Sequence, residues 1–321
     1  MTTAVKAAPF ARNHAIRDAL SRALYEGLRR DPSVHLFGEG CEVKQHYDAP
    51  DLLRDFPQRI HTMPIAEDGI VNFAVGASLM GILPVVDIIS ADFLYRAMDS
   101  LCNTAAKANH LQGAQRTIVV RAEFLTGGPT AGQRPEALFT HVPGLTVHVP
   151  STPADAYGLM TTALTTPGVH LIFEDRNIED EGYFQREDFY SQPGPFGRIS
   201  WRVRNPAANA TVLTYGLMRQ RVEALVAREN LRVNLYDLRS LYPLDMDGVM
   251  DAVHRTHRLL IVEPGVLHGG VGAEIAAQVA EAMPQVRVKR LGAPRVTIPQ
   301  AGSAQARLLP SDQEVRDALN F

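Results

Sequence analysis

The chain has 321 residues, 45% hydrophobic and 21% charged. This composition excludes a mostly disordered protein and allows roughly two domains of about 150 residues each. Lysine and arginine number 32 against 35 aspartates and glutamates, a net charge of −3, which argues against a protein built to bind nucleic acid or an anionic membrane surface. Cys41 and Cys102 are too few for a disulfide framework or a cysteine-rich zinc site. No stretch has the pattern of a targeting segment or of a membrane span, so we expect a cytoplasmic protein.

Helical and strand-like patterns alternate through the first half of the chain. Residues 67–80 are apolar around nearly the whole circumference, which predicts a helix buried on all sides. A long polar loop is expected at 41–57 and a glycine-rich loop at 126–132. The expected helices are 16–28, 67–80, 93–110 and 154–165, and the expected strands are 34–37, 84–89, 117–121, 146–149 and 170–174.

A second, smaller series of strands and helices follows a polar, proline-rich connection at about 175–206. The alternation predicts parallel strands joined by helices in both halves. We therefore expect one domain at 1–190, with the connection beginning near 175, and another at 200–321. The second series comprises expected strands 210–215, 232–237, 259–263 and 286–291, and expected helices 218–229, 245–254, 272–283 and 311–319.

The acidic pair Glu67-Asp68 opens the apolar helix and has two interpretations. Acidic residues in a first turn favourably oppose the helix dipole, which is the commoner role. Alternatively, Glu67 is partly desolvated against the buried helix, and burial suits a carboxyl group to proton transfer. The turn at 266–272 is glycine-rich, but its spacing favours a tight strand-to-helix turn over a phosphate site. The histidines form no zinc-type pair, so no metal site is expected.

Several motifs, in one order from about residue 13 to the end, resemble the beta subunit of thiamine-diphosphate-dependent 2-oxo-acid dehydrogenases, members of the transketolase-like superfamily. The motifs of the first half are Gly38-Glu39, Pro64-Ile-Ala-Glu67-Asp-Gly-Ile70, Asp92-Phe93, Phe139-Thr-His-Val-Pro-Gly-Leu145 and Pro150-Ser-Thr-Pro153. Those of the second half are Tyr236-Asp-Leu-Arg239, Tyr242-Pro-Leu-Asp245, Glu263 with Gly269-Gly270, and Gly272-Ala-Glu-Ile275.

The resemblance implies two three-layer α/β/α domains with mostly parallel sheets: a transketolase-like pyrimidine-binding domain and a transketolase C-terminal-like domain. It implies thiamine diphosphate shared with an alpha subunit, usually in an α2β2 assembly, and magnesium bound by that partner. The family's Gly-Asp-Gly magnesium motif does not occur in this sequence. A lipoyl-domain protein is a further partner that the resemblance suggests.

The resemblance also implies roles for five residues of this chain. Glu67 matches the carboxyl group that bonds to the aminopyrimidine ring and activates the cofactor for decarboxylation and acyl transfer. Phe93 matches the aromatic residue that stacks on the ring, and Ile65 falls where a backbone contact to the cofactor is expected. Glu39 matches a glutamate near the cofactor, and Arg96 stands where some members carry glutamine.

Two departures from the family pattern bear on the reaction. Ala131 stands where the family usually carries a histidine that handles the 2-oxo acid or its acyl intermediate. Glu123 replaces the usual proline after Arg121 and is expected to add a carboxylate near the active-site entrance. The replacement of the family histidine by Ala131 favours an alternative function, a ketol or acyl transfer in a specialised biosynthetic pathway. A second alternative is a non-catalytic partner subunit, although such a chain has no need of Glu67 and Phe93.

Overall fold

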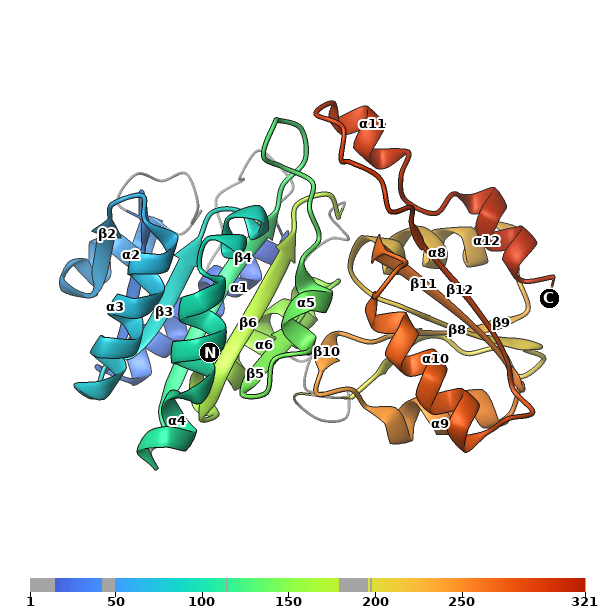
Figure 1. Ribbon diagram of the computed structural model, residues 1–321, viewed down its shortest axis with the longest axis horizontal. Helices are drawn as coiled ribbons and strands as arrows, with labels where there is room; N and C mark the ends of the chain where they lie inside the picture. The colour runs from blue at the N-terminus through green and yellow to red at the C-terminus, as the bar shows by residue number, and fades with distance from the viewer. Residues whose placement is uncertain (1–14, 42–49, 114, 179–195, 197, 321) are drawn as a thin grey trace, which may run out of the picture.

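The computed structural model describes residues 15–41, 50–113, 115–178, 196 and 198–320, and it contains two sheets, each covered by helices on both faces (Figure 1). The first sheet has seven strands in the order β10-β5-β6-β4-β3-β1-β2, and the second has five in the order β12-β11-β8-β9-β7. All pairings are parallel except β10 with β5 and β7 with β9. The predicted α/β class with mostly parallel sheets is confirmed.

The first half of the chain alternates strands with helices. The strands are β1 (Val34–Glu39), β2 (Ile60–Met63), β3 (Leu83–Ile88), β4 (Thr117–Phe124), β5 (Leu145–His148) and β6 (Gly168–Asp175). The α-helices are α1 (Ala15–Arg30), α2 (Pro50–Asp55), α3 (Glu67–Leu79), α4 (Ala106–Gln112), α5 (Glu136–Thr140) and α6 (Pro153–Thr165). Two 3-10 helices, η1 (Pro57–Arg59) and η2 (Ala91–Tyr95), and a π-helix, η3 (Ser100–Ala105), complete the series.

Elements of the second half follow the same pattern. The strands are β7 (Ser200–Val203), β8 (Ala210–Thr214), β9 (Val233–Asp237), β10 (Ser240–Tyr242), β11 (Arg258–Val266) and β12 (Arg287–Ala293). The helices are α8 (Gly216–Glu229), α9 (Met246–His254), α10 (Val271–Ala282), α11 (Gly302–Ala306) and α12 (Asp312–Ala318). Much of the predicted interdomain connection, 179–195 and 197, lies outside the described residues.

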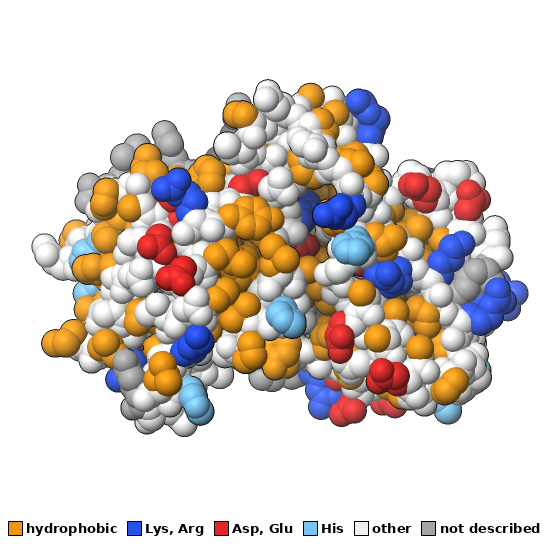
Figure 2. All heavy atoms as spheres, viewed as in Figure 1, with side chains coloured by type: hydrophobic (Ala, Val, Ile, Leu, Met, Phe, Trp, Pro, Cys, Tyr) orange, Lys and Arg blue, Asp and Glu red, His pale blue; other side chains and the backbone are white. Residues whose placement is uncertain are grey.

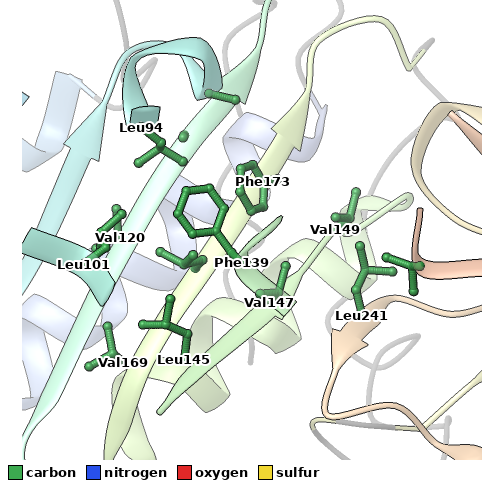
Figure 3. Close-up of a cluster of buried hydrophobic side chains, with 14 of the residues drawn as sticks. Leu94, Leu101, Val120, Phe139, Leu145, Val147, Val149, Val169, Phe173 and Leu241 are labelled. Carbon is green, nitrogen blue, oxygen red and sulfur yellow. The ribbon is translucent and has the colours of Figure 1, made fainter. Parts of the chain in front are cut away.

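The core is divided by the sheets. One cluster of buried side chains joins α1 and α6 to one face of the first sheet. A larger cluster fills the other face under α3, α4 and α5 and continues into the second half beneath α9 and α10. Figure 3 shows this continuity: Phe139 and Phe173 lie together over the first sheet, and Leu241 of the second half lies beside Val149. The two halves therefore share a hydrophobic core.

One predicted long helix has a different structure. The segment expected as a helix at 93–110 is divided into η2, η3 and α4. Ser100 opens the π-helical turn and donates a hydrogen bond to the Asp68 carbonyl oxygen at 3.2 Å, and Asn72 Nδ2 lies 2.6 Å from Ser100 Oγ. Contacts with α3 thus accompany the change in helical winding. Within the described ranges, no helix combines the length and the apolar character needed to span a membrane.

Candidate active site

Glu67 is the first residue of α3, and the residue is 3% exposed. The chain enters the helix from the edge strand β2 through Ala66, whose carbonyl accepts the Ile70 N–H at 2.8 Å. Helix α3 packs Ile70 and Val71 into the core, and Glu67 at its start is buried with them. The interpretation of Glu67 as a desolvated carboxyl therefore agrees with its position.

Glu39 ends β1 and is buried beside Glu67. Burial raises the pKa of the Glu39 carboxyl, and the nearby Glu67 charge raises it further, while a hydrogen bond from the Ala66 backbone opposes the shift. Glu39 Oε1 and Glu67 Oε2 are both buried and have no hydrogen-bond partner among the described residues. The two carboxyl groups form a buried acidic pair at the carboxyl end of β1.

Arg96, the residue that follows η2, contacts this pair, and Phe93 lies within η2. Arg96 Nε lies 3.2 Å from Glu67 Oε2, although the arginine side chain is 73% exposed. Phe93, one turn earlier, is half-buried against the core, and Ile65, two residues before Glu67, is 82% exposed. The structure thus brings Glu39, Glu67 and Arg96 together, with Phe93 and Ile65 on the adjoining segments.

Asp68 has surroundings unlike those of Glu67. Its Oδ1 accepts a short hydrogen bond from Ser100 Oγ, and its Oδ2 lies 3.4 Å from Asn72 Nδ2. These contacts tie the start of α3 to η3. Opposition of the helix dipole is therefore only part of what Asp68 does, and a local sequence pattern does not reveal the tie because Ser100 is 32 residues away.

The loop that carries Ala131 is held from the second half of the chain. Gln305 of α11 accepts the Gly127 N–H at 3.0 Å and donates to the Ala131 carbonyl at 2.9 Å. Gly132 has a φ of 104°, which only glycine adopts without strain. His141, after α5, is exposed. The sequence contains no histidine between His110 and His141.

The expectation that Glu123 lies near the active-site entrance is wrong. Strand β4 continues to Phe124, so Glu123 is a strand residue, and it points toward α1 rather than α3. Its Oε1 lies 2.7 Å from Arg17 Nη2 and 3.3 Å from Arg121 Nη2. Arg121 also pairs closely with Glu174. Glu123 therefore belongs to a buried ionic network on the opposite face of the sheet.

The expectation of a helix buried on all sides at 67–80 is also wrong for the single chain. Ile70, Val71 and Ala74 are buried. Phe73, however, is 51% exposed and Met80 83% exposed. The sequence pattern shows only how apolar each face of the helix is, whereas the described residues cover just one of these faces.

The glycine-rich turn at 266–272 packs around a carboxyl group. Gly272 N donates to Glu263 Oε2 at 3.2 Å, and Gly270 lies so close to Glu263 that a Cβ there would collide with its carboxyl oxygens. The tight-turn interpretation agrees with this geometry. In the described part of the chain, no group of three or more His, Cys, Asp or Glu side chains could hold a metal ion.

Two protein families match the chain. The family described as "Transketolase, pyrimidine binding domain" matches residues 12–179, and "Transketolase, C-terminal domain" matches residues 200–315. A solved chain described as "Split gene transketolase, inactive beta4 tetramer" superimposes with a TM-score of 0.79 and 20% identity, over 95% of this chain and 96% of that one. At that identity the likeness supports the fold alone.

Several curated relatives align over nearly their whole length. The pyruvate dehydrogenase E1 component subunit beta of Rickettsia bellii is 30% identical over 95% of this chain and 97% of its own. The same subunit of Rickettsia felis is 31% identical over 95% and 96%. The beta subunit of acetoin:2,6-dichlorophenolindophenol oxidoreductase from Cupriavidus necator is 29% identical over 96% and 97%.

Proposed function

We propose a function from one premise: the chain belongs to the family of thiamine-diphosphate-dependent 2-oxo-acid dehydrogenase beta subunits, built from transketolase pyrimidine-binding and C-terminal domains. It acts as the beta subunit of such an enzyme and supplies the aminopyrimidine half of the thiamine diphosphate site. Glu67 is its activating carboxyl group. The observation that carries this proposal is the burial of Glu67 at the start of α3, beside a second buried carboxyl group, Glu39.

The residues present fit the aminopyrimidine. Glu39 Oε1 is a buried oxygen without a hydrogen-bond partner among the described residues, and an unsatisfied buried acceptor is costly unless a ligand completes it. Glu67 Oε2 is buried as well and is ion-paired with the exposed Arg96. A ring nitrogen with a proton to share would do so. Arg96 contacts Glu67 from an exposed position, so it can turn away without breaking a buried packing contact. Phe93 offers a half-buried aromatic ring one turn before Arg96.

Thiamine diphosphate, when bound, supplies a carbon that attacks the carbonyl of the substrate after losing a proton. The role of this chain is to hold and return a proton at the buried Glu67 carboxyl group, which is shielded from water. Glu39 keeps the site acidic, and Phe93 and the backbone at Ile65 orient the ring. Magnesium and the diphosphate belong to the alpha subunit.

Assembly with other subunits is supported by the outer face of α3. Phe73, Leu79 and Met80 are large apolar side chains that the described residues leave exposed, and groups of exposed apolar side chains mark interfaces. Ile65, two residues before Glu67, is exposed as well. We propose an α2β2 complex in which the partner covers this face and closes the cofactor site. A purely structural role is the weaker alternative, because it gives the buried Glu39–Glu67 pair no purpose.

Ala131 favours a second candidate function. Its methyl group can neither donate nor accept a proton, and its backbone is held by Gln305. Ketol or acyl transfer to another small molecule, without a lipoyl-domain partner, is then the alternative reaction.

The test is reconstitution with the alpha subunit, magnesium and thiamine diphosphate. Pyruvate and branched 2-oxo acids are offered with a lipoyl domain in one arm and with an aldehyde acceptor in the other. Acyl transfer to the lipoyl domain supports the dehydrogenase, and product in the aldehyde arm alone supports carboligation. The Ala131→His variant should increase lipoyl transfer if the missing histidine limits it. No turnover in either arm from a complex that has bound the cofactor would indicate the structural role.

A further inference from the structure

The loop between β4 and α5 has few conformational restraints of its own. Gly127, Gly128 and Gly132 have φ angles of 77°, 125° and 104°, and glycine loses more conformational freedom on folding than any other residue. A loop of this composition adopts one arrangement only when contacts with other segments offset that loss. The residues that make those contacts therefore determine the shape of the loop.

Gln305 of α11 uses both polar ends of its side chain for this purpose. Its Oε1 accepts the Gly127 N–H at 3.0 Å, and its Nε2 donates to the carbonyl oxygens of Ala131 at 2.9 Å and Pro299 at 2.8 Å. The residue is 7% exposed, and a Cβ at Gly132 would lie 2.7 Å from its Nε2. The loop therefore packs directly against the amide group, and Figure 1 shows α11 beside the loop at the junction of the two halves.

The other side of the loop is attached to η2. Gln133 N donates to Asp92 Oδ1 at 3.1 Å. Asp92 and Phe93 are consecutive residues of η2, and Arg96, which follows this helix, lies 3.2 Å from a carboxyl oxygen of Glu67. The loop thus connects the segment that borders the candidate active site with the carboxyl-terminal half of the chain.

A cavity of about 270 Å³ adjoins these contacts. Tyr95 of η2, Gln133 of the loop and Gln305 all contribute to its lining. Figure 2 shows basic and histidine side chains beside the hollow at the junction of the halves. Because Tyr95 belongs to the same short helix as Phe93, the cavity borders the candidate active site.

We infer that Gln305 is a positioning residue for the substrate: it holds the loop at 127–132 as a fixed wall of this cavity, where the substrate lies. The inference rests on the proposed function and adds a residue of the second domain to it. Gln305 bonds to the backbone at Gly127 and Ala131, so the loop keeps its shape without a polar side chain at 131. These bonds do not reach Glu67, so Gln305 acts on substrate binding and not on the proton at Glu67.

The first measurement needs neither cofactor nor partner. Gln305→Met keeps the approximate length of the side chain and removes its polar atoms, so the loop loses two hydrogen bonds. Amide hydrogen exchange in the full chain should become at least about tenfold faster across 127–133, the effect of one hydrogen bond on local opening. Exchange within β4 should not change.

Gln278→Met is the matched control. Gln278 lies on α10 and donates to Glu274 Oε1, one turn away, at 2.7 Å. The same substitution there removes a hydrogen bond that is not connected to the loop. It should leave exchange across 127–133 unchanged.

The second measurement separates positioning from a general loss of structure. It uses the complex with the alpha subunit, magnesium and thiamine diphosphate, and whichever of pyruvate and a branched 2-oxo acid the unmodified complex consumes. Gln305→Met should raise the KM for this substrate about tenfold. Hydrogen–deuterium exchange at the thiazolium carbon, which reports on Glu67, should keep its rate. A residue with a merely structural role would change both quantities together or neither.

Gln305→Glu is a second variant of nearly the same shape. It keeps an oxygen for the Gly127 N–H but places another oxygen where Nε2 faces the carbonyls of Ala131 and Pro299. It should also raise the KM and leave thiazolium exchange unchanged. Circular dichroism checks that each variant is folded, and Gln305→Glu decides the outcome if Gln305→Met is not.

The outcomes distinguish this inference from the proposed function. Unchanged amide exchange of the loop, or an unchanged KM in a complex that exchanges its thiazolium proton, would overturn the inference and leave the proposed function in place. Equal losses of thiazolium exchange and substrate affinity would overturn it as well. An unmodified complex that binds the cofactor but exchanges no thiazolium proton would refute the proposed function, and the inference with it.

Discussion

Glu67 and Asp68 are consecutive residues of one helix, yet their carboxyl groups meet different surroundings. Glu67 is buried beside Glu39. Asp68 is bound by Ser100 and Asn72. The pair therefore offers a matched comparison, in which one amide substitution removes a proton-exchanging group and the other weakens a structural tie.

Glu67→Gln should reduce activity of the assembled enzyme by about 10²–10⁴-fold, the usual contribution of a general acid–base group. Glutamine preserves the size of the side chain but cannot exchange a carboxyl proton. The measurement is the rate of hydrogen–deuterium exchange at the thiazolium carbon in the complex with the alpha subunit.

Asp68→Asn is the control for this substitution. It should change the exchange rate much less and cost about 1 kcal/mol of stability through its weakened hydrogen bonds. Circular dichroism monitors folding of both variants. An unmodified exchange rate in Glu67→Gln, or a larger loss in Asp68→Asn, would contradict the assignment.

Asp87 Oδ1 lies 3.8 Å from Arg121 Nη1 and so joins the buried ionic network, which gives a pH prediction. Burial raises the pKa of Asp87 from 3.8 to about 6, with Arg121 opposing the shift. A folded-state pKa above the unfolded one contributes stability that is complete below pH 3.8 and is lost as the pH rises through about 6.

Asp87→Asn should therefore match the unmodified chain near pH 4 and become relatively more stable by pH 8. The gain is at most about 3 kcal/mol. Urea unfolding of both proteins at four pH values measures it. A difference that does not change with pH would rule out ionisation of Asp87 as its cause.

The sequence predicts the surroundings of some residues but not of others. Glu67 can be identified because the motif around it is local and its helix is conspicuously apolar. The positions of Glu123 and Gln305 cannot, because a strand residue changes face with a single step of register and Gln305 acts on a loop 174 residues away.

Long, periodic elements are predictable and short ones are not. The expected helix at 154–165 and strand at 170–174 agree within two residues with α6 and β6. Strands β2, β7 and β10 have three or four residues each, which is too short for an alternating pattern to be recognised in the sequence. The division of the predicted helix at 93–110 depends on contacts with α3, which a local pattern does not contain.

The exposed face of α3 predicts association. Met80 follows the helix and is 83% exposed, so Met80→Glu should leave the fold intact while placing a charge in the interface. Sedimentation or light scattering at micromolar concentration should show an oligomer for the unmodified chain and a shift toward monomer for the variant.

The control is Trp201→Gln, which removes an exposed apolar side chain from the second sheet and should not alter the mass. An unmodified chain that is monomeric throughout the concentration range would exclude self-association. The face would then be left for the alpha subunit alone.

The whole chain should bind thiamine diphosphate weakly or not at all in isolation. The diphosphate carries most of the ligand's charge, and its proposed site lies on the partner. Titration calorimetry with magnesium, before and after the alpha subunit is added, measures the difference. Tight magnesium-dependent binding by this chain alone would refute the proposed division of the cofactor site.

The first sheet ends on a strand that the second half supplies. Strand β10 pairs with β5 through Ser240 and His148. The amino-terminal half therefore supplies only six of the seven strands of the first sheet. A fragment that stops before residue 240 would expose the β5 edge and should aggregate. The same pairing constrains recombination between relatives. A carboxyl-terminal half taken from one relative must contain a β10 that can pair with β5 of the other.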